Sequence, residues 1–296
     1  MKITFLGTGA MQPTRERGLQ ALHVQCASGQ FLFDCGEGTQ RQFKGAGLKM
    51  TRLDKVFLSH FHGDHVLGFP GLLRSLGANN YQGHLEVYGP DGIEMIMHHM
   101  KHAALYRENV SLKLHSLEEG IVYEDDKIKI EAKKLKHSCP CFGFRLTEKG
   151  QRKMNLGYLK KFGLEEDPVL GKLQRGEDIV WKGKKISVQR ASFLGPSKIA
   201  AFVFDTSPCA AALFLAKNAD VLITESTFSS EEKEKALEYQ HLTAKQAAEI
   251  AKKAKAKRLV LTHFSQRYKD VSDLKREAEK IFPNVICAKD FFCLEI

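Results

Sequence analysis

The stretch Ser59-His60-Phe61-His62-Gly63-Asp64-His65 places three imidazoles and one carboxylate within six residues. It follows the apolar run Lys55-Val56-Phe57-Leu58, which predicts a buried strand that ends in a turn. Since alternate side chains of a strand point the same way, we expect His60 and His62 to reach one metal ion, with Asp64 and His65 turned toward a neighbouring position. Imidazole and carboxylate ligands without thiolate are typical of a hydrolytic zinc site and not of a cysteine-rich structural site.

Distant parts of the chain must supply the remaining ligands, because two adjacent metal ions need about eight and this stretch offers four. Three candidate residues each follow a strand-like run: His137 after residues 128–132, Asp205 after residues 199–204, and His263 after residues 258–262. Open α/β sheets place their sites at such strand ends. A single histidine there is usually an ordinary surface or core residue, but three residues with the same placement favour a site. An exposed histidine-rich loop is the alternative interpretation.

The size and charge of the chain limit the class of protein and of partner. Its 296 residues allow one or two domains, and we expect one α/β domain with an insertion, because the proposed ligands run from His60 to His263. The net charge of +10 favours a polyanion such as nucleic acid, since each neutralised phosphate releases counterions. The alternative is a solvated, lysine-rich surface that binds no ligand.

Cysteine usage and hydropathy indicate the compartment. The seven cysteines are odd in number and show no paired framework, so we expect reduced thiols and a cytoplasmic protein. Cys139-Pro140-Cys141 is too tightly spaced for a usual zinc motif, and we expect it to border the site without a role. No apolar run approaches 18 residues and no segment resembles a signal peptide, which argues against membrane spanning and secretion.

Hydrophobic periodicity predicts a β-rich first half and a second half that alternates helices with strands. Expected strands cover residues 2–6, 21–25, 30–34, 85–88, 220–224 and 258–261, and expected helices cover residues 66–77, 92–102, 243–256 and 270–281. Thr243 and Gln246 have the spacing of a capping box at the start of the third helix. His98, His99 and His102 have ligand-like spacing on a helix, but no acidic partner supports them, and we interpret them as surface or core residues.

Further motifs resemble those of the ribonuclease Z family, the tRNA 3′-processing endonucleases of the metallo-β-lactamase superfamily. The similar stretches are Phe5–Gly9, Leu32–Gln40 and Leu261–Tyr268, and the resemblance covers nearly the whole chain in order. The histidine cluster alone also fits lactamases, glyoxalases and sulfatases, whereas Leu32–Gln40 is much more specific to ribonuclease Z. The resemblance implies a four-layer αβ/βα sandwich with a protruding basic arm.

Four positions depart from the family pattern. Phe204-Asp205-Thr206 stands where the family has Gly-Asp-Thr, and Thr224-Glu225-Ser226-Thr227 keeps the acid of His-Glu-Ala-Thr but loses its preceding histidine. His241-Leu242-Thr243 replaces His-Ser-Thr. Residues 13–18 match the family's Pro-x-Lys-x-Arg-Asn loop only loosely, and this loop is implicated in choosing the cleavage position.

The segment from residue 148 to about 198 is the expected arm. It holds 12 Lys and Arg against 6 Asp and Glu, an excess of +6. Within it, Gly163–Gly176 resembles the flexible arm of ribonuclease Z, with Asp167-Pro168 in place of the family's Gly-Pro. The resemblance implies an exosite that grips tRNA, with Lys172 and Arg175 as candidate contacts. An ordinary basic subdomain or a long loop pair is the alternative.

The resemblance also implies the roles of the site residues. It assigns His60, His62 and His137 to one Zn²⁺, assigns Asp64, His65 and His263 to a second, and makes Asp205 the bridging ligand. Mn²⁺ is the alternative metal. Asp64 is the expected proton acceptor for the attacking water, and His241, oriented by Glu225, is the expected proton donor to the departing 3′-oxygen.

These expectations predict a zinc-dependent endonuclease that removes the 3′ trailer from precursor tRNA and leaves a 3′-hydroxyl. The candidate substrate contacts near the site are Arg15, Ser265, Gln266, Arg267 and Tyr268, because arginine suits phosphate and tyrosine can stack on a base. The family leads us to expect a homodimer. A small-molecule hydrolase of the same fold and a non-catalytic nucleic-acid-binding scaffold are the competing functions.

Overall fold

The computed structural model describes residues 1–104 and 110–296 of the chain. The chain divides into two compact units. The main unit consists of Met1–Thr147 and Ile199–Ile296, and the insert unit consists of Glu148–Lys198. Every residue expected at the metal site belongs to the main unit, whereas the candidate contacts Lys172 and Arg175 belong to the insert unit.

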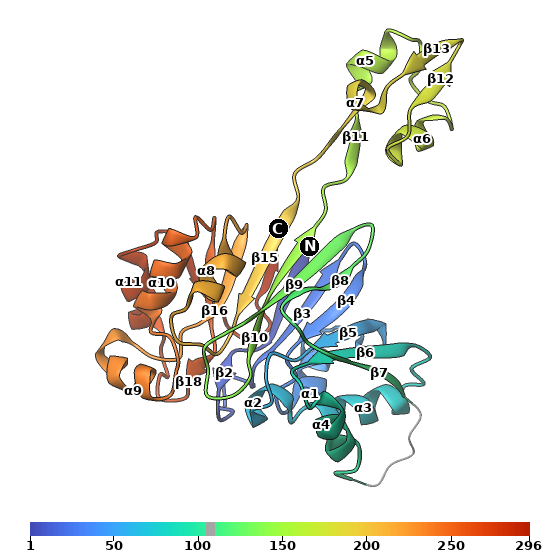
Figure 1. Ribbon diagram of the computed structural model, residues 1–296. Coiled ribbons are helices and arrows are strands. Elements are labelled where there is room, and N and C mark those ends of the chain that lie inside the picture. The colour runs from blue at the N-terminus through green and yellow to red at the C-terminus, as the bar shows by residue number, and fades with distance from the viewer. Residues whose placement is uncertain (105–109) are drawn as a thin grey trace. The chain divides into compact units, whose positions relative to one another are not determined.

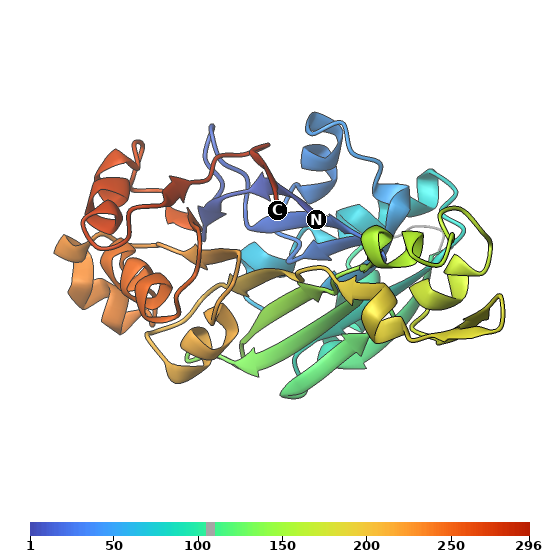
Figure 2. The same cartoon turned by 90° about the horizontal axis from the view of Figure 1, so that it is seen from above.

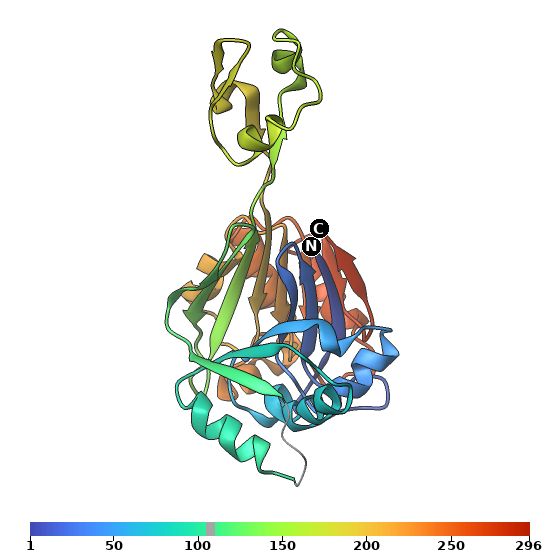
Figure 3. The same cartoon turned by 90° about the vertical axis from the view of Figure 1, so that its right-hand side faces the viewer.

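The first seven-stranded sheet of the main unit contains both ends of the chain. In spatial order its strands are β20 (Cys293–Glu295), β1 (Lys2–Gly7), β3 (Ala21–Cys26), β4 (Gly29–Phe33), β5 (Leu53–Phe57), β6 (His84–Gly89) and β7 (Ser111–Ser116). β20 pairs with β1 in the antiparallel direction, and the amino group of Met1 donates a hydrogen bond of 3.2 Å to the carbonyl oxygen of Ile296. The two termini, labelled N and C, accordingly lie side by side in Figure 3.

The second seven-stranded sheet carries most of the second half of the chain. In spatial order its strands are β19 (Val285–Cys287), β17 (Leu259–Thr262), β16 (Val221–Glu225), β15 (Lys198–Val203), β10 (Phe142–Glu148), β9 (Ile128–Lys134) and β8 (Gly120–Glu124). The four strands from β15 to β19 are parallel, so their carboxyl ends share one edge. A short parallel pair, β2 (Gly9–Ala10) with β18 (Phe264–Ser265), joins the start of the chain to the segment after β17.

Aromatic side chains fill the space between the two sheets. The ring of Phe33 from the first sheet stacks on Phe202 of the second at a centroid distance of 4.2 Å and on Phe57 at 5.0 Å. Phe204, which replaces the family's glycine before Asp205, is fully buried in this same core. Its bulk is therefore accommodated by packing against the sheets, and Asp205 still lies among the other predicted ligands.

Helices cover the outer faces of both sheets. The helices of the main unit are α1 (Thr39–Gly45), η1 (Met50–Arg52), α2 (Gly63–Val66), α3 (Phe69–Ala78), α4 (Ile93–Lys101), α8 (Ala210–Ala216), η2 (Ser230–Glu232), α9 (Lys233–Glu238), α10 (Ala244–Lys253) and α11 (Ser272–Glu279). Apolar residues of α1, α3 and α4 pack on the first sheet, and those of α8, α10 and α11 pack on the second. These two groups lie on opposite sides of the sheets in Figures 1 and 2, so the predicted four-layer α/β sandwich is confirmed.

The helix expected over residues 66–77 is α3, which begins only at Phe69, whereas Val66 ends the short α2. Between them, Gly68 N donates to the carbonyl oxygen of Cys35 at 2.9 Å, which interrupts the intrahelical hydrogen bonds. A Cβ atom at Gly68 would approach the carbonyl oxygen of Gly36 to 1.9 Å, so this close packing requires glycine. The capping box predicted for α10 is present, with Thr243 and Gln246 bonded reciprocally.

The insert unit has a hydrophobic core of its own. Its elements are β11 (Arg152–Met154), α5 (Leu156–Lys160), α6 (Leu170–Gln174), β12 (Ile179–Trp181), β13 (Lys184–Ile186), α7 (Val188–Ala191) and β14 (Ser192–Leu194). β11 pairs with β14, and β12 pairs with β13. Leu159, Leu164, Leu173 and Ile186 are almost completely buried together. The segment is therefore a folded subdomain and not a loop pair.

No helix in the described part of the chain combines the length and the apolar character that crossing a membrane requires.

Candidate metal centre

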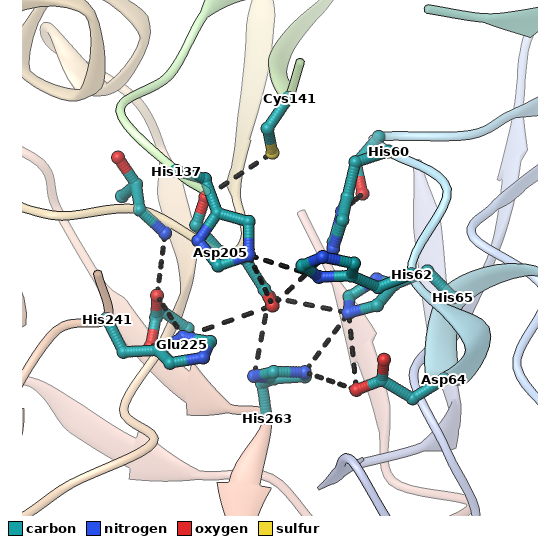
Figure 4. Close-up of polar contacts among 12 residues, drawn as sticks. His60, His62, Asp64, His65, His137, Cys141, Asp205, Glu225, His241 and His263 are labelled. Carbon is teal, nitrogen blue, oxygen red and sulfur yellow. Dashed lines mark hydrogen bonds and ion pairs between the residues drawn. The ribbon is translucent and has the colours of Figure 1, made fainter. Parts of the chain in front are cut away.

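The structure brings together all seven side chains that the sequence predicted as metal ligands. They come from the loop after β5, from α2, and from the loops that follow β9, β15 and β17 (Figure 4). Within each of two groups the ligand atoms lie within 4.8 Å of one another: His60, His62, His137 and Asp205 form the first, and Asp64, His65 and His263 form the second. The reason expected for the first pair was wrong, because β5 ends at Phe57 and His62 is the N-cap of α2. A loop therefore positions the two histidines, and strand alternation does not.

The first group has the dimensions of a tetrahedral cation site. His137 Nε2 lies 3.2 Å from His62 Nδ1, and Asp205 Oδ2 lies 3.7 Å from both His60 Nε2 and His137 Nε2. Ligands bound at about 2.0–2.1 Å around Zn²⁺ are separated by about 3.3 Å in a tetrahedron. The observed separations are close to this value, so the four side chains fit one divalent cation.

The second group lies against the first, and Asp205 of the first group also approaches it; Asp205 forms a further close group with His241 and His263. His263 Nε2 lies 3.1 Å from His65 Nε2 and 3.3 Å from Asp64 Oδ2. Asp205 Oδ1 lies 3.4 Å from His65 Nε2, whereas Oδ2 of the same carboxylate faces the first group. A carboxylate with one oxygen in each group has the geometry of a bridging ligand between two cations.

Two buried polar atoms at the centre have no hydrogen-bond partner. They are Nε2 of His60 and Oδ1 of Asp205, and both face the other ligands. A buried polar atom without a partner is costly, so natural proteins rarely leave one. Burial and the nearby His65 hold the pKa of His60 well below its usual value, so its imidazole is neutral, as a metal ligand must be. The donor set and these atoms together fit a divalent metal centre.

Asp34 supports ligands of both groups from behind, a role that the sequence reasoning missed. Its carboxylate is fully buried and accepts hydrogen bonds from Ser59 N at 2.7 Å, Ser59 Oγ at 2.9 Å and His65 Nδ1 at 2.7 Å. Ser59 Oγ in turn lies 2.9 Å from His60 Nδ1. These bonds turn Nε2 of both imidazoles toward the centre, which is the usual arrangement behind metal-bound histidines. An acid directly after the apolar run Phe31–Phe33 was the available signal.

The ligands from the rest of the main unit have similar support. His263 Nδ1 lies 3.0 Å from Thr227 Oγ1, which donates to Glu225 at 2.6 Å. His137 Nδ1 donates to the carbonyl oxygen of Gln240 at 3.1 Å, which leaves Nε2 for the centre. Thr227 and the main-chain oxygen of Gln240 were not predicted, since contacts between residues far apart in the chain leave no local pattern.

His241 and Glu225 form the predicted pair beside the metal ligands. His241 Nδ1 lies 3.0 Å and 3.1 Å from the two oxygens of Glu225, a fully buried carboxylate that also accepts from Thr206 N at 2.7 Å. Burial opposes the charged imidazole, but Glu225 outweighs it and raises the pKa of His241 to about 9. The imidazole is therefore protonated at neutral pH. Thr224, which replaces the family's histidine, is buried without disturbing this pair.

The cysteine pair borders the centre without contributing ligands to the two groups. Cys141 Sγ donates to the carbonyl oxygen of Asp205 at 3.3 Å, as Figure 4 shows. Burial raises the pKa of the Cys141 thiol well above its usual value, so it stays protonated. None of the seven cysteines, all of which the structure describes, forms a disulfide bond.

A cavity of about 620 Å³ opens onto the ligands. Ser265, Gln266 and Arg267 line it, in agreement with their candidate placement near the site. Tyr268 is instead packed beside it, with its hydroxyl accepting from Ser229 N at 2.9 Å. Arg15 is exposed on the neighbouring loop and is not among the lining residues.

Met11 also lines the cavity and contacts a predicted ligand through its backbone. Its N–H donates to Asp64 Oδ2 at 2.7 Å, although Met11 adopts a φ of 62°. Outside the cavity, His98, His99 and His102 are exposed at the end of α4 and belong to neither ligand group, in agreement with their interpretation as surface residues.

Comparison with known proteins gives matches over the whole chain. Ribonuclease Z of Bacillus licheniformis is 39% identical over 305 residues, covering 100% of this chain and 99% of the relative. Ribonuclease Z of Enterococcus faecalis is 37% identical and covers 100% of this chain and 97% of the relative. The crystal structure of the short form of human tRNase Z has a TM-score of 0.72 and 30% identity, covering 100% of this chain and 99% of that one.

Two further similarities concern part of the chain or the fold alone. A family model described as anti-Pycsar protein Apyc1 matches residues 1–150, which contain the His60–His65 stretch and His137 but not Asp205 or His263. The metallo-β-lactamase fold protein YhfI from Bacillus subtilis has a TM-score of 0.72 at 21% identity, over 100% of this chain and 98% of that one. With identities near 40% along its full length, the chain belongs to the ribonuclease Z family and has the metallo-β-lactamase fold.

Proposed function

We propose that this chain is a metal-dependent endoribonuclease that removes the 3′ trailer from precursor tRNA and leaves a 3′-hydroxyl. The observation that carries the proposal is the convergence of seven imidazole and carboxylate ligands into two adjoining groups beside a cavity. Two metal ions about 3.5–4 Å apart would suit the attacking and leaving oxygens of a phosphodiester. The ribonuclease Z relatives, which match the whole chain, support the choice of tRNA as the substrate.

We assign two Zn²⁺ ions to the centre, one to each group, with Mn²⁺ as the alternative. The ligand set supports this assignment, because imidazole suits Zn²⁺ and the carboxylates accommodate either ion. When bound, the ions would supply Lewis acidity and an activated water. The seven side chains would hold them, with Asp205 shared between the two.

Two side chains are assigned to proton transfer. Asp64 accepts the proton of the attacking water, since its carboxylate belongs to the second ligand group and lines the cavity. His241 protonates the departing 3′-oxygen, and Glu225 holds its imidazole in the charged form until that step. His263 lies between the two, 3.3 Å from Asp64 and with its ring 5.7 Å from that of His241, so the acceptor and the donor are on different sides of it, which suits an in-line displacement (Figure 4).

The insert unit is assigned to tRNA binding away from the cut. Its excess of +6 and the exposure of Lys172 support a contact with the sugar–phosphate backbone. Arg175 is exposed as well, and it would exchange its exposed ion pair of 3.1 Å with Glu177 for a phosphate. A homodimer and a cytoplasmic location complete the proposal. The first is expected from the family, and the second is supported by seven cysteines without a disulfide bond.

The test combines metal analysis with mapping of the cut on precursor tRNAs, with and without an encoded CCA end. His62→Ala and Asp64→Ala should each abolish cleavage, because each removes a ligand from one group. His99→Ala is the matched control, since His99 is an exposed histidine outside both groups, and it should cleave normally. Normal turnover by either site variant would contradict the proposal, and hydrolysis of small esters without RNA cleavage would favour a small-molecule hydrolase.

A further inference from the structure

An aromatic side chain is exposed on the cavity wall close to His241. Tyr239 lines the cavity, and half of its surface, 50%, is accessible to solvent. Behind it, the buried ring of Phe228 lies nearly parallel at a centroid distance of 6.4 Å and an angle of 17°, and the guanidinium of Arg267 covers Phe228 at 4.9 Å. Tyr239 is thus the solvent-exposed member of a cluster of three flat side chains on the cavity wall.

The cations beside this cluster are already ion-paired. The guanidinium of Arg267 is paired with Glu232 at 2.9 Å, and the same carboxylate also pairs with Lys235 at 2.7 Å. Glu238, the neighbour of Tyr239, lines the same wall and adds a carboxylate. A nucleobase can stack on the exposed ring without needing a cationic partner.

The backbone fixes this ring relative to the catalytic residues. Tyr239 N donates to the carbonyl oxygen of Lys235 at 2.9 Å, and His241 N donates to that of Ala236 at 2.8 Å, so both residues are tied to α9. Between them, the carbonyl oxygen of Gln240 accepts from His137. A base stacked on Tyr239 would therefore be held at a constant position relative to the centre.

We propose that Tyr239 is the stacking platform for the base of the last nucleotide retained on the tRNA, whose 3′-oxygen departs. The inference rests on the proposed function, in which His241 protonates that oxygen. Because Tyr239 is only two residues from His241 along a fixed segment, the base nearest to it is the one attached to the same ribose. The subsite needs only a flat ring, so it accepts any of the four bases at that position.

The test pairs two substitutions with one altered substrate. Tyr239→Ala should lower kcat/KM for precursor tRNA about 5- to 10-fold, mainly through KM, which is the low end for loss of one base–aromatic stack because the ring is half-exposed. Tyr239→Phe keeps the ring and should match the unaltered protein. Leu237→Ala is the control, since Leu237 is 75% exposed on α9 but does not line the cavity.

The altered substrate carries an abasic residue at the last retained nucleotide. The kcat/KM of the unaltered protein should be about 5- to 10-fold lower on this substrate than on the normal precursor. The kcat/KM of Tyr239→Ala should be the same on the two substrates. On a second precursor, which is abasic at the first trailer nucleotide, Tyr239→Ala should lower kcat/KM by the same factor as on the normal substrate. The proposal would be overturned if Tyr239→Ala lowered kcat/KM, relative to the unaltered protein, by the same factor on the normal precursor and on the precursor that is abasic at the retained nucleotide.

A binding measurement separates this proposal from failure of the proposed function. A short RNA carries 2-aminopurine at the retained position and a methylenephosphonate in place of the scissile 3′-oxygen, so it keeps its charge and cannot be cut. Binding to the zinc-loaded protein and to Tyr239→Phe should quench the fluorescence, and binding to Tyr239→Ala should not. Absence of precursor cleavage with Tyr239-dependent quenching would refute the nuclease and leave a base-stacking subsite. Quenching that is equal in all three proteins would refute the subsite alone.

Discussion

Replacing Asp34 by asparagine tests whether the buried carboxylate determines which nitrogen of His65 faces the metal. The change preserves size and alters only charge and donor pattern. Asp34 now accepts from His65 Nδ1–H at 2.7 Å, which leaves Nε2 free to bind. If the new amide keeps its oxygen toward Ser59 N, its NH₂ group faces His65 Nδ1. The imidazole must then move its proton to Nε2, the atom that a cation requires.

The expected magnitude follows from these contacts. Asp34 accepts three hydrogen bonds, and the asparagine that replaces it can preserve only the one from Ser59 N without rearrangement. Loss of a partner behind a metal-bound histidine typically weakens metal affinity by about 10- to 100-fold. This corresponds to about 1.4–2.7 kcal/mol of binding free energy. The effect should fall on the second ligand group, to which His65 belongs.

The assay is competition for Zn²⁺ with a fluorescent chelator, followed by the rate of precursor cleavage at saturating Zn²⁺. Asp125→Asn is the matched control, because Asp125 also accepts three hydrogen bonds, two from backbone N–H groups at 2.8 Å each and one from the Tyr123 hydroxyl at 2.9 Å, but lies outside the ligand groups. Its affinity should equal that of the unaltered protein. If Asp34→Asn binds two Zn²⁺ ions as tightly as the control, Asp34 does not set the tautomer and the reasoning fails.

Three further outcomes are expected. Lys172→Ala with Arg175→Ala should raise KM for precursor tRNA several-fold and flatten its salt dependence, with hydrolysis of a small phosphodiester unchanged; equal loss on both substrates would argue against an exosite. Because Glu225 raises the pKa of His241, the proton donor is present at low pH and is lost as the pH rises toward about 9, so activity should fall there. Bound cations would lower the pKa of His241 and so shift this fall in activity to lower pH. His241→Asn should be slow throughout and should not show the fall. Phe202→Ala should cost about 3–5 kcal/mol of unfolding free energy in guanidinium titrations, since the ring is fully buried on Phe33; a cost below about 1 kcal/mol would contradict the inter-sheet core.

The resemblance to ribonuclease Z implied the sandwich, whereas the seven clustered residues were predicted because they leave local patterns. The apolar runs form the strands, and the acid or imidazole comes just after the end of the run, as at Asp205 and His263. The residues behind the ligands were not predicted. Ser59 reaches Asp34 across 25 positions, and His137 reaches Gln240 across 103, so no spacing in the sequence reveals either contact.

The break between α2 and α3 escaped prediction for a related reason. The expected helix places Leu67, Leu72 and Leu76 on one face, but Leu67 is 57% exposed whereas the other two are buried. What interrupts the helix is the carbonyl oxygen of Cys35 from a distant motif, which accepts from Gly68 N. Tertiary contact therefore overrides a pattern that is locally helical.

The structure also changes how the insert unit should be tested. The stretch Gly163–Gly176 resembles a flexible arm, and its removal is the obvious experiment. Leu164 and Leu173 lie in that stretch and belong to the core of the unit. Deletion would therefore unfold the unit as well as remove its charges. The paired substitution at Lys172 and Arg175 removes charge from exposed positions and keeps the core.

Each ligand group draws on both chain segments that flank the insert. Asp205 and His263 follow it, whereas the other five ligands precede it. A bound metal ion would therefore link the two chain segments, and the resulting stabilisation of the folded state would depend on the concentration of free metal. At 100 times the dissociation constant, each ion would add about 2.7 kcal/mol to the folded state. Metal starvation would thus lower the melting temperature together with the turnover, so that metal supply would control the lifetime of the molecule as well as its rate.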